Sequence, residues 1–404
     1  MIEYYIICLF LLWCIPMLYI RIKYPFWCSQ PVLHTYDVFR FWSSVPYIIQ
    51  SRVPIKSRYL DNQIVVLSFL DTPQNNLSDV VKLLQAHYVE SASMLTEFTK
   101  EYIETDMVGY TNPIYLSYKY EYNIGNNNVM IGCMTSRAIK MFIYTNKCAI
   151  EEWFTYYFDY ICIHRDFIKH NLGHSFIESH GRYQRCNNQT IQSSLFKKEI
   201  SLCSGVVPVT QFRTYTFDFP VINRPPMSKF TVIQIEPSNA EIVYDVLYNI
   251  THDTKNTPFS FCAFPEITVL DNLIKTGQIF VYVIKYKTQI TGVYFFKDTK
   301  LSYEDMKQGD TKPILEFTCS IMVTQSKNSH NLFFGGFLQS LHDFQRKHPK
   351  FKLLLFPDIA HNRVIIDKWK FKYQPRSITE TAYYLYNMVI PKMPLNNNQC
   401  FICV

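Results

Sequence analysis

The sequence predicts an α/β protein with a mixed sheet, built from two successive modules. The chain has 404 residues, which is the length of two ordinary domains. Hydrophobic residues make up 48% of it, with 31 Phe and 30 Tyr, a composition typical of a folded protein rather than a disordered one. Beyond residue 24 the same order of elements, from helix to strand hairpin to helix to strand, can be read twice.

The first module is predicted to span residues 24–219. An apolar stripe predicts its first helix, formed by Val80, Val81, Leu83, Leu84 and Tyr88. Strands are predicted over about residues 113–121, 129–134, 140–144 and 154–163, then a helix over about 173–185 and a strand over about 199–207.

The second module is predicted to span residues 226–404, because the proline-rich stretch 220–226 breaks both kinds of periodicity. Ser238 and Glu241 fit a capping box that opens a helix, whose apolar face is Ile242, Val243, Val246, Leu247 and Ile250. Strands are predicted over about 279–286 and 290–296, a helix around 337–344 and an apolar strand over 351–356.

The first twenty residues differ sharply from the rest of the chain. Residues 4–20 are almost uninterruptedly apolar, and Arg21 and Lys23 follow directly. Because Glu3 precedes the apolar run and bulky residues follow it, we expect an uncleaved membrane anchor over residues 1–23 rather than a signal peptide. Residues 1–20 would contact the membrane, and the positive charges after them place the body in the cytosol. The alternative is a buried N-terminal helix of a soluble protein.

Charge and cysteine content narrow the class of partner. The net charge of +7 suits an anionic ligand or an acidic membrane surface, but the basic residues are dispersed, which disfavours nucleic acid. The 12 cysteines include no CxxC pair, so we expect reduced thiols and neither a zinc ribbon nor a disulfide framework. We expect a monomer.

A strand, a basic loop and a helix follow one another at residues 158–173. The apolar segment 158–164 is followed by Arg165 and Lys169, and then by Gly173 at the predicted start of a helix. Free amides at a helix start attract anions, so this order is typical of a phosphate-binding loop. The alternative is an ordinary strand-to-helix turn with solvated side chains.

Histidines in the same region also allow a metal interpretation. His170 and His174 have the i, i+4 spacing of helical ligands, and His164 and His180 are near in sequence. No acidic or cysteine partner has motif spacing, so we expect surface and core histidines and no bound metal.

Six segments, in register to the end of the chain, resemble the eukaryotic N-myristoyltransferases. They are YPFWCSQPV at 24–32, HYVE at 87–90, DYICIH at 159–164, CSGVVP at 203–208, DIAHN at 358–362 with KF at 370–371, and YYLYN at 383–387 followed by Pro391 and Met393. The resemblance implies two tandem GNAT-like halves, the first holding acyl-CoA and both forming a groove for a glycine-first peptide. The co-substrate would be myristoyl-CoA, with no prosthetic group.

The resemblance also implies roles for individual residues. The backbone amides of Tyr160 and Ile161 would form the oxyanion hole for the thioester carbonyl, and Asp159, Cys203 and Gly205 would lie near the peptide's glycine. The residues expected to contact acyl-CoA are Tyr24, Phe26, Trp27, His87, Tyr88, Val89, Ile161, Cys162, Ile163, Lys169, His170, Asn171, Leu172 and Gly173.

The general base implied by the resemblance is the carboxylate of Val404. An α-ammonium must lose a proton before it attacks a thioester, and burial would make a terminal carboxylate a better base than it is in water. The segment Cys400 to Val404 suits a short buried strand that ends between the halves. The alternative is an apolar tail that fills the core, with Asp159 as the base.

Departures from the family pattern lie at the substrates' polar groups. The basic phosphate loop has fewer fixed charges, Asp159 replaces an Asn and Cys203 a Thr, and residues 91–94 and 372–377 lack the family's acidic and glycine-rich loops. We therefore weigh an active, membrane-anchored N-myristoyltransferase with a different peptide preference against two alternatives. These are an inactive binding protein with the same fold and a GNAT-type transferase that uses a shorter acyl-CoA.

Overall fold

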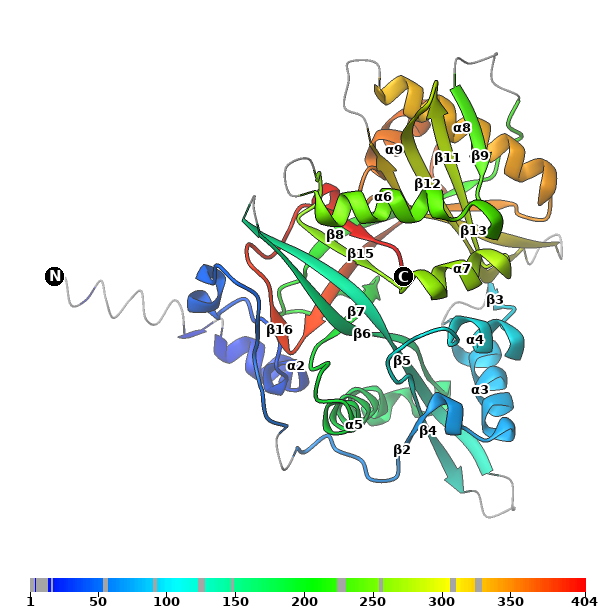
Figure 1. The fold of residues 1–404 in the computed structure, drawn as a ribbon. Coiled ribbons are helices and arrows are strands. Elements are labelled where there is room, and N and C mark those ends of the chain that lie inside the picture. Colours follow the sequence, from blue (N-terminus) through cyan, green and yellow to red (C-terminus); the bar gives the residue numbers. More distant parts are fainter. Residues whose placement is uncertain are drawn as a thin grey trace.

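The structure is a computed structural model. It describes residues 4, 14–15, 17–53, 57–89, 93–122, 128–146, 149–223, 230–253, 257–305, 310–323 and 329–404. One mixed sheet of 15 strands runs through the described residues, and a second sheet has two strands. Figure 1 shows this sheet extending across two stacked halves, with the C-terminus between them.

The elements of the first half follow the N-terminal segment. They are α2 (Pro25–Ser29), η1 (Val38–Trp42), β1 (Tyr47–Ile48), β2 (Val65–Ser68), η2 (Phe69–Asp71), α3 (Gln74–His87), β3 (Met94–Thr96), α4 (Lys100–Asp106), β4 (Tyr115–Tyr122), β5 (Asn128–Asn146), β6 (Ala149–Ile163), η3 (Arg165–His170), α5 (Leu172–Asn187), β7 (Ser194–Glu199) and β8 (Thr210–Asp218).

The second half begins at β9. Its elements are β9 (Phe230–Gln234), η4 (Pro237–Asn239), α6 (Glu241–His252), β10 (Phe261–Phe264), α7 (Ile267–Lys275), β11 (Ile279–Tyr286), β12 (Gln289–Asp305), β13 (Asp310–Met322), α8 (Ser329–Lys347), β14 (Leu353–Pro357), α9 (Asn362–Lys370), β15 (Ser377–Tyr386), β16 (Met388–Val389), η5 (Asn397–Gln399) and β17 (Cys400–Ile402).

The two halves repeat one topology. In the first, β4, β5 and β6 form an antiparallel meander and β6 pairs in parallel with β7 after the crossover helix α5. In the second, β11, β12 and β13 form the same meander and β13 pairs in parallel with β14 after α8. The predicted duplication of two α/β modules in a mixed sheet is therefore confirmed.

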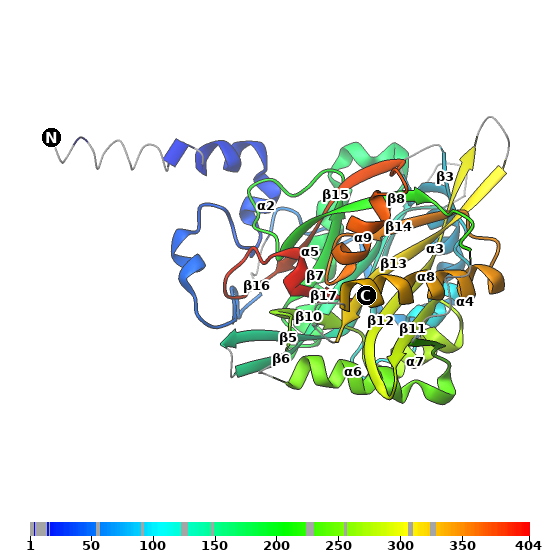
Figure 2. The same cartoon turned by 90° about the horizontal axis from the view of Figure 1, so that it is seen from above.

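The halves exchange strands where they meet. β15, from the end of the chain, pairs with both β7 and β8, while β8 of the first half pairs with β14 of the second. The chain end returns as β17, which pairs in parallel with β10, and β10 pairs with β5. Both views in Figures 1 and 2 accordingly place the C-terminus in the middle of the molecule.

Each crossover helix approaches its sheet closely over a glycine. A Cβ at Gly132 of β5 would lie 2.4 Å from the Phe176 ring of α5, and one at Gly292 of β12 would lie 2.7 Å from the Phe333 ring of α8. Only glycine admits these aromatic rings so close to the strand. The same contact therefore recurs at corresponding strands of the two halves.

The two strands predicted over 129–134 and 140–144 are one continuous strand, β5. Polar residues at 135–137 interrupt the apolar pattern, but they are buried and have partners. The Ser136 hydroxyl is 2.7 Å from His180 Nε2, and Arg137 is paired with two carboxylates. Tertiary contacts thus satisfy polar side chains at the break that was predicted between two strands.

The strand predicted over 199–207 is wrong. β7 ends at Glu199, and the chain then turns at Ile200 and Gly205, whose φ angles are 64° and 79°. Extended residues need negative φ, so the β-rich composition around Val206 does not form a strand here. The predicted capping box is also displaced, because Glu236 and Asn239, rather than Ser238 and Glu241, form it ahead of α6.

Residues 17–23 form a helix that leads into α2, and the rest of the predicted anchor 1–23 lies almost wholly outside the described residues. Within the described part of the chain, no helix is long and apolar enough to cross a membrane. Leu18, Tyr19 and Ile22 are exposed, so the alternative of a buried N-terminal helix does not fit this part of the segment.

Candidate active site

The candidate site begins where β6 and β7 separate. In these parallel strands, residues 156–158 of β6 pair with residues 194–196 of β7. The pairing ends there, although β6 continues to Ile163 and β7 to Glu199. Beyond that point the facing edges of the two strands no longer pair with each other. Main-chain groups along this edge of β6 are thus placed to bind another molecule.

A β-bulge lies on β6 just past this separation. Between the register pairs Thr135–Asp159 and Cys133–Cys162, Tyr160 and Ile161 together face one residue of β5. Tyr160 has a φ of 47°, which is uncommon for a residue with a side chain. The predicted oxyanion amides therefore belong to a locally distorted strand.

The side chains of the bulge point to opposite environments. Tyr160 is buried and its hydroxyl donates to Asp106 over 3.1 Å, whereas Ile161 is 42% exposed. Burial raises the pKa of Tyr160 well above its ordinary value, so its hydroxyl stays neutral. An exposed isoleucine in the middle of a sheet suits contact with an apolar ligand.

The predicted segment 87–89 lies against the end of β6. The His87 and His164 rings are 3.9 Å apart, and Arg165 donates to the Val89 carbonyl over 3.0 Å. Burial, His164 and Arg165 all lower the pKa of His87, so the ring stays neutral. Three further predicted residues lie in the same region. Tyr88 packs near Tyr160, and the Cys162 thiol donates to the Leu83 carbonyl. Ile163 packs against a cluster of buried residues.

The predicted phosphate loop joins β6 to the start of α5. Asn171 has a φ of 54° and Leu172 opens α5 with no side-chain cap on the helix. A Cβ at Gly173 would meet nothing within 4 Å, so the surface beside this helix start is open. The side chains of Lys169 and His170 lie outside the described part of the chain.

The predicted N-terminal residues lie beside the same helix start. The buried Phe26 ring stacks on His174 at 4.1 Å, and Trp27 stacks on Phe196 of β7 at 5.5 Å. Tyr24 precedes α2 as its N-terminal flanking residue. Sequence segments 24–27 and 171–174, far apart in the chain, thus lie together at the open end of the β6–β7 separation.

The residues predicted near a peptide glycine are placed differently from one another. Asp159 is on β6 next to the bulge, and its Oδ1 accepts from the Tyr160 N–H over 2.9 Å. The Cys203 N–H donates to the Tyr384 hydroxyl over 3.1 Å in a buried position. Gly205 lies under the N-terminal helix, since a Cβ there would be 2.5 Å from Ile20.

The chain end lies where the halves meet. β17 is buried as predicted for a short strand, and the half-buried Val404 packs against the cluster that contains Tyr157 and Tyr383. Lys297 of β12 donates to the main-chain oxygen of Val404 over 3.2 Å. A cation from the second half thus fixes the end of the chain.

A charged group that the sequence did not indicate lies between the halves. Lys197 of β7 is 2.7 Å from Glu199 and 3.8 Å from Glu316 of β13, which is itself the register partner of Lys297. Burial opposes its charge, but Glu199 and Glu316 hold the pKa of Lys197 above its ordinary value. Three strands separate β7 from β13 in the sheet order, so the sheet curls to bring these side chains together.

The second half has the same strand separation, but its own side chains fill it. β13 and β14 are in register only up to Glu316 and Leu355. Beyond that point the buried Asn362 amide donates to the Phe317, Thr318 and Pro357 carbonyls, at 2.9 to 3.3 Å.

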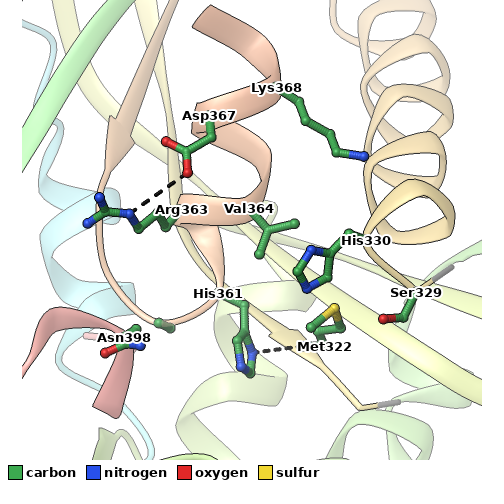
Figure 3. A pocket seen from close by; sticks show the side chains of 10 residues that line it. Met322, Ser329, His330, His361, Arg363, Val364, Asp367, Lys368 and Asn398 are labelled. Atoms are coloured by element: carbon green, nitrogen blue, oxygen red, sulfur yellow. Dashed lines mark hydrogen bonds and ion pairs between the residues drawn. The ribbon is translucent and has the colours of Figure 1, made fainter. Parts of the chain in front are cut away.

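A cavity of about 580 Å³ lies between α8 and α9 of the second half (Figure 3). Several of its charged and imidazole side chains, those of Arg363, Asp367, His361 and Lys368, already have partners. Arg363 is 3.8 Å from Asp367, and His361 Nδ1 accepts from the Met322 N–H over 2.9 Å. Lys368 is hydrogen-bonded to Asn331. We therefore place the candidate site in the first half, where β6 and β7 no longer pair and Ile161 is exposed.

The described histidine side chains of the metal interpretation, those of His164, His174 and His180, are not grouped as metal ligands. His180 is fully buried, with Nδ1 2.9 Å from the Ser117 hydroxyl and Nε2 2.7 Å from that of Ser136. Burial lowers its pKa to about 3, so it is a neutral core residue. Among the residues that the structure describes, no three His, Cys, Asp or Glu side chains are grouped as metal ligands.

Comparisons with known proteins show the fold. No protein-family model matches the chain, and neither does any curated protein. A structure of Saccharomyces cerevisiae N-myristoyltransferase with bound myristoyl-CoA matches with a TM-score of 0.70 and 14% identity, over 93% of this chain and 94% of that chain. Another, with bound myristoyl-CoA and inhibitors, matches with a TM-score of 0.68 and 13% identity, over 93% and 91%. The chain therefore has an N-myristoyltransferase-like fold.

Proposed function

We propose that this protein transfers a fatty acyl group, myristoyl, from coenzyme A to the N-terminal glycine amine of a protein or peptide. The observation that carries the proposal is the bulge at Tyr160 and Ile161, placed where β6 and β7 separate. The fold supports it, because structures of the yeast N-myristoyltransferase that match this chain hold myristoyl-CoA. The exposed Ile161 and the aromatic residues of α2 suit an acyl chain, and the start of α5 suits phosphates.

The reaction is a direct attack of the amine on the thioester. The Val404 carboxylate takes a proton from the substrate ammonium, which Asp159 helps to hold. The amine nitrogen then forms a bond to the thioester carbonyl carbon, and the negative charge on its oxygen is stabilised by the amides of Tyr160 and Ile161. As the carbon–sulfur bond breaks, the coenzyme leaves as a thiolate, which takes up the second proton that the attacking nitrogen loses as it becomes an amide. The products are the N-acylated peptide, coenzyme A and the protonated base.

Transfer of labelled myristate from its CoA ester to a panel of glycine-first peptides tests the proposal. The expected result is acylation at the amine that is lost when the peptide is N-acetylated. Acetyl-CoA and butyryl-CoA belong in the same panel, because preferred transfer of a short acyl group would instead support a GNAT-type transferase. The absence of transfer from every acyl-CoA would contradict the proposal.

The second candidate function is acyl-CoA binding without turnover. One contact favours it, because Asp159 already accepts a hydrogen bond from the Tyr160 amide that an oxyanion would need. Binding of myristoyl-CoA, measured by calorimetry, together with no transfer to any peptide would support this candidate over the first.

We also propose that residues 1–20 hold the protein to a membrane, with its body in the cytosol. The apolar run of the sequence supports this proposal, as do the exposed Leu18 and Ile22. Nearby, Phe39 and Trp42 of η1 are exposed as a pair, with ring centroids 6.3 Å apart. Exposed aromatic rings of this kind are common at membrane interfaces.

High salt is expected to leave the protein bound to phosphatidylcholine vesicles, because apolar burial is not screened by ions. Deleting residues 1–16, which retains Ile20 over Gly205, is expected to release it. Flotation of vesicles with and without phosphatidylserine measures both effects. Release of the full chain by salt alone would show that charge, rather than apolar burial, holds it.

A further inference from the structure

A buried ion cluster lies directly beneath the bulge. One guanidinium nitrogen of Arg137, on β5, is 2.8 Å from an oxygen of Asp106 and 2.8 Å from one of Asp159. The side chains of Arg137 and Asp106 are 3% and 2% exposed, whereas that of Asp159 is 19% exposed. Asp159 is thus the member of the cluster that another molecule can reach.

Both carboxylates hold the strained residue of the bulge. Asp106 accepts from the Tyr160 hydroxyl over 3.1 Å, and Asp159 accepts from the Tyr160 N–H over 2.9 Å. Since Arg137 joins the two carboxylates, the position of the Asp159 side chain depends on the buried pair behind it. A substitution at Asp106 would therefore alter the position or the charge balance of the Asp159 carboxylate.

The charges of the cluster do not balance. Two carboxyl groups are paired with one guanidinium, so acidic groups outnumber basic ones in a largely buried place. The neighbouring hydroxyls add no further negative charge, because burial raises the pKa of Tyr160 and Tyr110 and keeps them neutral. A cation that reached Asp159 would complete the pairing of two negative with two positive charges.

We propose that Asp106 and Arg137 are positioning residues that set how strongly Asp159 holds a cationic acceptor amine. The inference rests on the proposed function, in which the acceptor arrives as an ammonium beside Asp159. Neither residue touches the acceptor. Arg137 fixes the position of the Asp159 carboxylate. Asp106 supplies a second negative charge, so that Arg137 does not neutralise the charge of Asp159.

Asp106→Asn tests this charge count. Asparagine has the same shape, and its one amide oxygen can accept from both Arg137 and the Tyr160 hydroxyl, which share one oxygen of Asp106. The substitution leaves Arg137 and Asp159 as a neutral pair. The measurement is the Kd of a glycine-first peptide in the presence of an unreactive thioether analogue of myristoyl-CoA, beside that of the same peptide N-acetylated. The variant is expected to lower the preference for the free amine about tenfold or more, since a nearby buried charge has been lost.

The controls separate this role from a structural one. Asp71→Asn makes the same chemical change at an exposed position and is expected to leave the preference unchanged. An unchanged preference in Asp106→Asn, or equal weakening of both peptides with a lowered unfolding temperature, would overturn the inference. An unmodified protein that binds both peptides equally would overturn it too. The inference and the proposed function fail separately, because transfer of labelled myristate by the unmodified protein is measured in its own assay.

Discussion

Extending the 404-residue chain by two residues beyond Val404 is expected to lower kcat at least about 100-fold, the contribution that a well-placed general base makes. The extension would move the free carboxylate away from Lys297, which binds it at 3.2 Å, and put a neutral amide in its place. Because β17 stays intact, the affinity for acyl-CoA should change little. Single-turnover transfer of labelled myristate, with calorimetric binding of myristoyl-CoA, measures the two effects separately.

Val404→Ala is the matched control, because it changes the last side chain and keeps the carboxylate. Its kcat is expected to remain within a few-fold of that of the unmodified protein. Deleting residues 402–404 is a poorer test, since it also removes the buried Ile402 and costs stability. An extended chain with normal kcat would exclude the terminal carboxylate as the base and favour Asp159.

Periodicity predicted those parts of the fold in which local pattern and tertiary environment agree. The strand at 279–286 and the helix whose apolar face includes Val243 and Leu247 were predicted at their observed positions. The pattern failed where buried polar residues have distant partners, as at Ser136 with His180. It failed again at Ile200 and Gly205, because φ angles of 64° and 79° turn a β-rich segment into a loop.

The candidate site, like the fold, was predicted only in part. The resemblance predicted the segments that the fold brings together, such as 87–89 beside His164. It gave no sign of the charged residues around them, because their partners come from other elements. Lys197 and Glu316, for example, are far apart in the sequence and 3.8 Å apart in space. The available signal was a single charge between two apolar segments, as at Arg137, which alone does not identify a partner.

Among the described residues, the two halves differ at the point where their parallel strands separate. In the first half, β6 and β7 no longer pair beyond Phe158 and Phe196, and no other described strand pairs with these facing edges. In the second half, Asn362, the first residue of α9, lies between β13 and β14, and its amide makes hydrogen bonds to both strands in place of strand pairing. One polar side chain thus turns a potential ligand site into part of the core.

Asn362→Ala is therefore expected to lower the free energy of unfolding by about 3 kcal/mol or more, the cost of leaving several buried polar groups without partners. The carbonyls of Phe317, Thr318 and Pro357 would lose their donor, and the Ser320 hydroxyl would lose an acceptor 2.7 Å away. Urea unfolding measures the loss.

The matched control for this variant is Asn398→Ala, which removes an exposed asparagine from the neighbouring turn and is expected to change stability by less than about 0.5 kcal/mol. Because the open site lies in the other half, folded Asn362→Ala should bind myristoyl-CoA as tightly as the unmodified protein does. If the two variants unfolded at the same urea concentration, the Asn362 bonds would not be what closes the second half. Binding of a second equivalent of myristoyl-CoA by Asn362→Ala would instead show that the space between β13 and β14 can hold this ligand. The Asn362 side chain alone would then account for the exclusion of the ligand from the second half.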